Sequence, residues 1–256
     1  MNIIRHIPNT ITSMNLLCGV LGVIASLNGR LELGFELMIL AAVFDFCDGL
    51  AARLLKAYSE IGKELDSLAD DVSFGVLPAV MLYQISGTDI WILKYLPLVL
   101  AAFSALRLAK FNLDERQHDS VRSILPYEVW GRQHDSFIGL PTPAAAMICG
   151  SLATLVTVRP DCFLAHWCQG QVFIPVLTLI LCYLLICEIP MFSMKFGGGK
   201  KASKLEVAKR IAFLVIVGLA AIIALVERSH WSFIFLTSFL GYILINLAMS
   251  DLVAKK

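Results

Sequence analysis

The chain has 256 residues, of which 58% are hydrophobic and 16% charged, and its net charge is +1. Soluble domains carry about 25% charged residues, so this composition indicates an integral membrane protein. It excludes a disordered chain and a disulfide-rich scaffold. The small net charge also provides no basic field for nucleic acid, and we expect no nucleic-acid partner.

Apolar stretches of about 20 residues, the length that crosses about 30 Å of hydrocarbon, cover most of the chain. They span residues 10–28, 32–55, 64–84, 90–111, 137–158, 171–194, 205–227 and 231–251. Short segments rich in turn residues separate them, apart from a longer polar loop over 112–136. We therefore predict an all-α polytopic bundle of about eight transmembrane helices, forming one integral membrane domain over residues 1–256.

The basic residues are unevenly divided between the two sides of this predicted bundle. Seventeen of the 21 Lys and Arg residues fall on the side of both termini, and the remaining four are Arg30, Lys94, Arg159 and Arg228. Cytoplasmic loops and flanks are enriched in Lys and Arg. The asymmetry predicts cytoplasmic N- and C-termini and a location in the cell (inner) membrane.

Five aspartates crowd the cytoplasmic ends of the second and third stretches, namely Asp45, Asp48, Asp66, Asp70 and Asp71. An Asp at the centre of a membrane helix costs roughly 2.5–3.5 kcal/mol, so this cluster needs compensation. At about 100° per residue, Asp45 and Asp48 share one helix face, and Asp66 and Asp70 share another. Asp71 points away from that face.

The short connection makes the second and third helices antiparallel neighbours, so the two acidic faces can converge. Four carboxylates at close quarters repel one another unless they are protonated or bound to cations. Ligands that are all oxygen suit hard divalent ions. We therefore expect two ions of Mg²⁺ or Mn²⁺ at these aspartates.

Small residues and an arginine accompany the carboxylates. Gly49 and Gly62 share the acidic faces, where the absence of a side chain lets a ligand approach the backbone. Arg53 lies one turn beyond Gly49, and its guanidinium could pair with a phosphate oxygen. Metals and an arginine in this arrangement indicate a pyrophosphate site. A divalent-cation transporter is the alternative from another class, although it predicts carboxylates spread across the membrane depth.

Residues 45–70 read Asp45-x2-Asp48-Gly49-x2-Ala52-Arg53-x8-Gly62-x3-Asp66-x3-Asp70. This spacing resembles the signature of the CDP-alcohol phosphotransferase family. The resemblance implies a six-helix membrane core, here about residues 5–200, with two extra helices over about 205–251. It also implies a reaction in which an alcohol displaces CMP from a CDP-linked donor, with a divalent metal.

The same resemblance implies roles for the residues of the signature. Asp45, Asp48 and Asp66 would bind the metal, and Asp70 would act as the base toward the alcohol while also lying at the metal site. Gly49, Ala52, Arg53 and Gly62 would hold the nucleotide and pyrophosphate of the donor. Members of the family are expected to form homodimers in the lipid bilayer.

Four further segments resemble the bacterial and archaeal phosphatidylserine synthases of this family: Pro8–Gly19, Arg107–Asn112, Gly139–Ala146 and Pro190–Phe196. This implies CDP-diacylglycerol as the donor and L-serine as the acceptor. The serine carboxylate needs a cationic partner, and Arg107, Lys110 and the amide of Asn112 are the candidates. Two alternatives stay open. These residues could be an ordinary positively charged flank, and the acceptor could be glycerol 3-phosphate or inositol phosphate, which would call for more cations.

Three polar residues, Asn9, Thr12 and Asn15, lie at an otherwise apolar helix start. Helix capping explains part of this pattern. Contact with the nucleotide or with the second helix is the competing interpretation.

Overall fold

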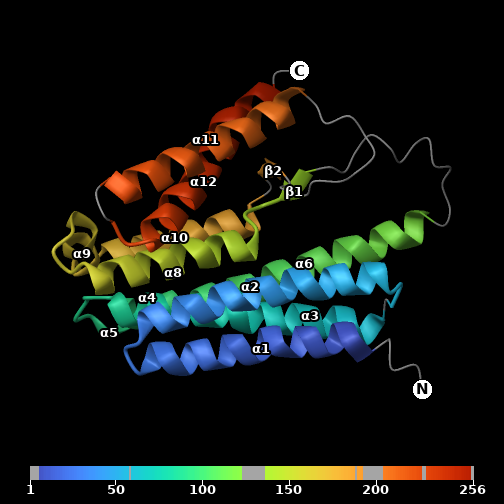
Figure 1. The fold of residues 1–256 in the computed structure, drawn as a ribbon, viewed down its shortest axis with the longest axis horizontal. Helices are drawn as coiled ribbons and strands as arrows, with labels where there is room; N and C mark the ends of the chain where they lie inside the picture. Colours follow the sequence, from blue (N-terminus) through green and yellow to red (C-terminus); the bar gives the residue numbers. More distant parts are fainter. Residues whose placement is uncertain are drawn as a thin grey trace.

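A computed structural model describes residues 6–57, 59–122, 136–187, 189–192, 204–226 and 229–254 of the chain. These residues are helical apart from connecting turns and one antiparallel ribbon, in which β1 (Ser136–Ile138) pairs with β2 (Pro190–Phe192). The helices, shown in Figure 1, are α1 (His6–Leu27), α2 (Leu31–Leu54), α3 (Glu60–Asp71), α4 (Leu77–Ile85), α5 (Trp91–Tyr95), α6 (Val99–Arg122), α8 (Thr142–Val158), α9 (Phe163–Cys168), α10 (Phe173–Ile186), α11 (Lys204–Val226) and α12 (Ser232–Ala254).

The predicted class, a polytopic helical membrane protein, is confirmed. Among the described residues, the helical runs long and apolar enough to cross a membrane are His6–Leu27, Glu60–Ile85, Trp91–Leu113 and Val207–Val226. Three further apolar helices are shorter, namely Thr142–Val158, Phe173–Ile186 and Ser232–Ala248. The second predicted stretch is also a single helix, α2, which carries Asp45 and Asp48 of the signature.

Three predicted boundaries are wrong for physical reasons. The fifth stretch was expected to begin at residue 137, but Ser136–Ile138 is strand β1 and α8 begins at Thr142, directly after Pro141. The sixth stretch was expected to continue to residue 194, but α10 ends at Ile186 and the chain is extended from Pro190. Proline has no N–H to continue a helix and is accepted at the start of an edge strand. The segment from residue 112 was expected to be a loop, but α6 continues to Arg122, because hydropathy marks the apolar part of a helix and not its end. The rest of that loop, residues 123–135, lies outside the described residues.

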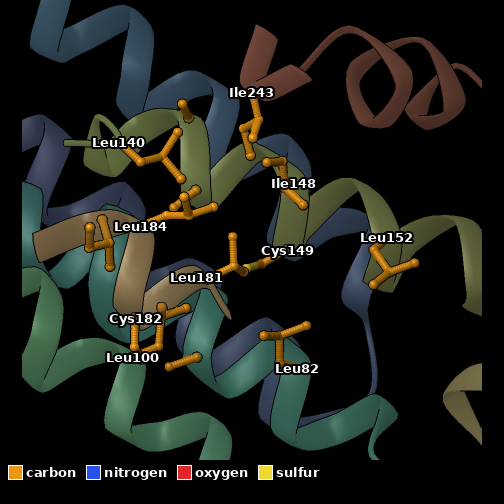
Figure 2. Close-up of a cluster of buried hydrophobic side chains, with 14 of the residues drawn as sticks. Leu82, Leu100, Leu140, Ile148, Cys149, Leu152, Leu181, Cys182, Leu184 and Ile243 are labelled. Atoms are coloured by element: carbon orange, nitrogen blue, oxygen red, sulfur yellow. The ribbon is translucent and has the colours of Figure 1, made fainter. Parts of the chain in front are cut away.

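Helix α8 lies at the centre of the bundle, where it packs against α2, α4 and α12. Every residue of α8 from Ala144 to Leu155 is buried. Figure 2 shows Ile148, Cys149 and Leu152 of α8 beside leucines of α4 and α10. A helix that is apolar over most of its surface is expected in the core of a bundle.

The helical run Glu60–Ile85, which contains α3 and α4, is continuous. One π-helical turn, η2 (Val72–Val76), interrupts its α-helical hydrogen bonding. Pro78 follows this turn and cannot donate a hydrogen bond back along the helix. Turns of this kind often occur at functional sites. Here the turn begins directly after Asp70 and Asp71.

The π-helical turn is fixed to α1 by a close helix contact. The Ser73 hydroxyl donates to the Asn15 carbonyl oxygen at 3.1 Å and to the Asn15 Oδ1 at 2.8 Å. A Cβ added at Gly19 would clash with the Ser73 hydroxyl and lie 3.0 Å from the Ser73 Cα. Only glycine at position 19 allows the two backbones to approach this closely.

We predict that Gly19→Ala destabilises the folded protein by about 1–3 kcal/mol, the usual cost of overpacking. The measurement is the thermal unfolding midpoint of the purified protein in detergent. Gly218→Ala is the matched control, because no described atom lies within 4 Å of the Cβ it would add on α11. Equal midpoints for both variants would show that the contact between α1 and η2 is not tight.

Candidate active site

Three aspartates from two helices form an acidic group. One carboxylate oxygen from each of Asp45, Asp48 and Asp66 lies within 4.8 Å of the other two. Asp45 and Asp48 are on α2, and Asp66 is on α3, whose N-cap residue is Ser59. The sequence predicted α2 and α3 as direct neighbours, but both pack mainly against α1. The acidic side chains, not the helix backbones, meet between α2 and α3.

These three residues fit a hard divalent cation. Asp48 is 5% exposed. Its Oδ2 and the Oδ1 of Asp66 are buried and have no hydrogen-bond partner among the described residues. Buried polar atoms without partners are costly, and clustered carboxylates repel one another. A cation such as Mg²⁺ or Mn²⁺, which prefers oxygen ligands, would relieve both costs at once.

Asp70 lies beside this acidic group and is held from α1. The Asn15 Nδ2 donates to the Asp70 Oδ1 at 3.1 Å, and the Asn15 Oδ1 accepts from the Ser73 hydroxyl. The Asp70 carboxyl lies near those of Asp45, Asp66 and Asp48. The hydrogen bonds from Ser73 through Asn15 therefore fix the orientation of the Asp70 carboxylate. Its role as a base and as a metal ligand stays a prediction.

The sequence indicated Asn15 as an unusual polar residue but suggested different partners for it. The structure shows that the hydrogen bonds of the Asn15 amide join it to Asp70 of α3 and to Ser73 of η2. Ser73 was missed, because one serine in an apolar helix is too common to be a signal.

Asp71 faces away from the acidic group, as the helical geometry predicted. Its Oδ1 lies 2.6 Å from the position that a Cβ on Gly75 would occupy. The Ser104 hydroxyl of α6 lies 2.7 Å from the same position. Asp71 therefore points toward α6, although it is adjacent in sequence to Asp70.

The other residues of the signature lie around the acidic group in different ways. Arg53 is exposed, and its Nε donates to the Gly49 carbonyl oxygen at 2.8 Å. A Cβ on Gly49 would meet only the Arg53 Nη2, at 3.7 Å, among the described residues. Ala52 is partly buried on the same helix. The space beside Gly62 is filled, since the Asn9 Oδ1 lies 2.8 Å from its added Cβ. Gly62 thus allows α1 to approach α3, and ligand contact there stays a prediction.

The candidate acceptor residues do not share one environment. Arg107 is partly buried, and its Nη1 lies 3.5 Å from the Thr142 hydroxyl at the start of α8. Lys110 is on the exposed side of α6. The Asn112 amide donates to the Ser67 hydroxyl at 2.9 Å and so joins α6 to α3. Arg107 is therefore the cation of this set that faces the interior of the bundle.

We predict that the purified protein binds Mn²⁺ and that Asp48→Asn weakens this binding at least tenfold. An amide removes one negative charge and offers a weaker ligand to a hard cation. Titration monitored by electron paramagnetic resonance measures the free ion. Asp71→Asn is the matched control, because that carboxylate faces α6 and should leave the affinity almost unchanged. Equal affinity in wild type and Asp48→Asn would contradict the assignment of Asp48.

Comparisons with known proteins agree with this geometry. The profile of the CDP-alcohol phosphatidyltransferase family matches residues 5–186. The chain is 31% identical over 192 residues to the CDP-diacylglycerol-serine O-phosphatidyltransferase of Mycobacterium tuberculosis, covering 75% of this chain and 62% of that protein. It is 35% identical over 144 residues to the protein of the same name from Bacillus subtilis, covering 56% of this chain and 72% of that protein.

A third relative of that name, from Methanocaldococcus jannaschii, is 31% identical over 150 residues, covering 59% of this chain and 61% of that protein. The chain therefore spans about three fifths of the length of the mycobacterial and archaeal relatives. The family match covers most of the chain and includes the whole acidic signature, with α11 and α12 beyond it. The chain belongs to the CDP-alcohol phosphatidyltransferase family.

Proposed function

We propose that this chain transfers the phosphatidyl group of CDP-diacylglycerol to L-serine, producing phosphatidylserine and CMP. The observation that carries the proposal is the group of three carboxylates within 4.8 Å, with Asp70 held beside it. The family generally uses a divalent metal, and this group suits one. The choice of serine is supported by the names of the relatives, which share 31–35% identity with the chain.

Asp45, Asp48 and Asp66 would hold two metal ions. Asp70 would lie at the edge of this metal site. Bound Mg²⁺ or Mn²⁺ would neutralise the pyrophosphate and stabilise the charge that develops on its oxygens. Arg53, which is exposed beside Gly49, would pair with a phosphate oxygen of the donor. The acyl chains of the donor would lie in the surrounding lipid.

Asp70 would take the proton of the serine hydroxyl. The hydroxyl oxygen forms a bond to the phosphorus nearer the lipid, and the bond from that phosphorus to the CMP oxygen breaks. Asn15 donates to one oxygen of the Asp70 carboxylate, so the carboxylate is oriented before the acceptor arrives. Preorientation of this kind lowers the entropic cost of the reaction.

Arg107, Lys110 and Asn112 are the proposed acceptor residues. Arg107 fits best, because it faces the interior of the bundle near Asp70 and could hold the serine carboxylate near the base. We further propose a homodimer in the cell membrane, with the active site on the cytoplasmic face. The distribution of Lys and Arg supports this orientation.

Release of CMP tests the proposal. Purified protein in mixed micelles of CDP-diacylglycerol with Mg²⁺ or Mn²⁺ is offered L-serine, glycerol 3-phosphate or inositol phosphate in turn. We expect release with L-serine and none when the metal is removed with EDTA. Release only with a phosphorylated acceptor would overturn the choice of serine. Release with none, together with uptake of Mn²⁺ by reconstituted vesicles, would favour a cation transporter.

We predict that Asp70→Asn lowers CMP release at least a thousandfold, because an amide cannot take the proton, while binding of CDP-diacylglycerol is largely retained. Asp71→Asn is the control, since its carboxylate points toward α6, and it should keep most of the activity. A comparable loss in both variants would contradict the assignment of Asp70 as the base.

A further inference from the structure

Helix α12 carries a buried polar stripe that lies beyond the residues matched by the family profile. Ser238, Tyr242 and Asn246 are four residues apart and share one helix face. They are 4%, 2% and 0% exposed, respectively, in a helix that is otherwise mostly apolar. Polar groups inside a membrane bundle either join helices or mark a functional site.

Two contacts of α6, one with α3 and one with η2, show how deep in the bundle Arg107 lies. Asn112 hydrogen-bonds Ser67, and Ser104 lies against Gly75. Since the helices run antiparallel, these pairs place Arg107 level with Asp71 and Val72, at the depth of Asp70. Arg107 therefore enters the bundle at the level of the proposed base.

Arg107 has donor capacity that its described neighbours do not use. Its Nε is buried and has no hydrogen-bond partner among the described residues. Its contact with the Thr142 hydroxyl, at 3.5 Å, is long. A guanidinium offers five N–H donors in a planar fork that matches a carboxylate. The unused Nε is the feature expected of an arginine that binds an anionic ligand.

Tyr242 lies on the α12 side of this arginine. Tyr242 and Asp70 are among the ionisable groups near the Arg107 guanidinium. Helix α12 packs on α8, which begins at Thr142. Ile243, the next residue after Tyr242, lies near Leu140 and Ile148 in Figure 2. Tyr242 itself belongs to the buried cluster that includes Leu140 and Ala144 at the start of α8, where Thr142 contacts Arg107.

We propose that α12 completes the acceptor pocket, with the Tyr242 hydroxyl donating a hydrogen bond to the carboxylate that Arg107 binds. This inference rests on the proposed function and deepens it, because it assigns acceptor selectivity to a helix beyond the family match. Tyr242 is thus a specificity-determining residue for an amino acid acceptor. The phenol suits this task, since its rigid ring carries one donor and needs no second charge.

The test compares L-serine with L-serinamide, which keeps the hydroxyl and the amine but lacks the carboxylate. The quantity measured is the ratio of kcat/KM for the two acceptors, obtained from CMP release by the full chain. We expect Tyr242→Phe to lower this ratio about tenfold, the scale of one hydrogen bond to a charged group. The loss should fall on the KM for L-serine, and the KM for CDP-diacylglycerol should stay unchanged. Arg107→Ala should lower the same ratio further.

Tyr183→Phe is the matched control, because Tyr183 is 69% exposed on α10 and should not change the ratio. The unfolding midpoint in detergent shows whether Tyr242→Phe is folded. The second variant is Thr142→Val, on the other side of Arg107.

If the wild type uses L-serine but the ratio is unchanged in Tyr242→Phe and in Thr142→Val, the stripe only joins helices and this inference is wrong. If the wild type releases CMP only with a phosphorylated acceptor, the proposed function itself has failed.

Discussion

The carboxylates of Asp45, Asp48 and Asp66, held within 4.8 Å of one another, are the constraint on which the rest of the structure depends. At that separation or less, and with an effective dielectric constant of about 20, each pair of charges would repel by about 3.5 kcal/mol or more. The repulsion can be relieved by protons or by a cation, but the helices must keep the group together in either case. A site that is costly when empty is suited to hold divalent ions, and with them a pyrophosphate.

Helix α1 provides the framework that opposes this repulsion. It packs against both α2 and α3, whose acidic side chains meet. Gly19 allows the close approach of Ser73, and Asn15 links Ser73 to Asp70. The π-helical turn after Asp71 coincides with this contact. The helix that contains no residue of the acidic signature thus positions the proposed base.

The sequence was sufficient for the features that depend on local periodicity. The helical class, the acidic faces of α2 and α3 and the outward direction of Asp71 follow from hydropathy and from 100° per residue. Features that depend on packing between distant segments could not be predicted. No pattern shows that Asn15 reaches Asp70, that Asn9 fills the space beside Gly62, or that Arg107 and Lys110 lie in different surroundings. The polar stripe on α12 is visible in the sequence at positions 238, 242 and 246, but the proximity of Tyr242 to Arg107 is not.

The central claim is that Asp45, Asp48 and Asp66 bind divalent metal ions together. Diffraction from crystals of this protein grown with Mn²⁺, measured on both sides of the manganese absorption edge, tests it most directly. The account predicts an anomalous peak in contact with oxygens of all three residues. A peak elsewhere, or these three carboxylates without any peak at a Mn²⁺ concentration that supports CMP release, would contradict it.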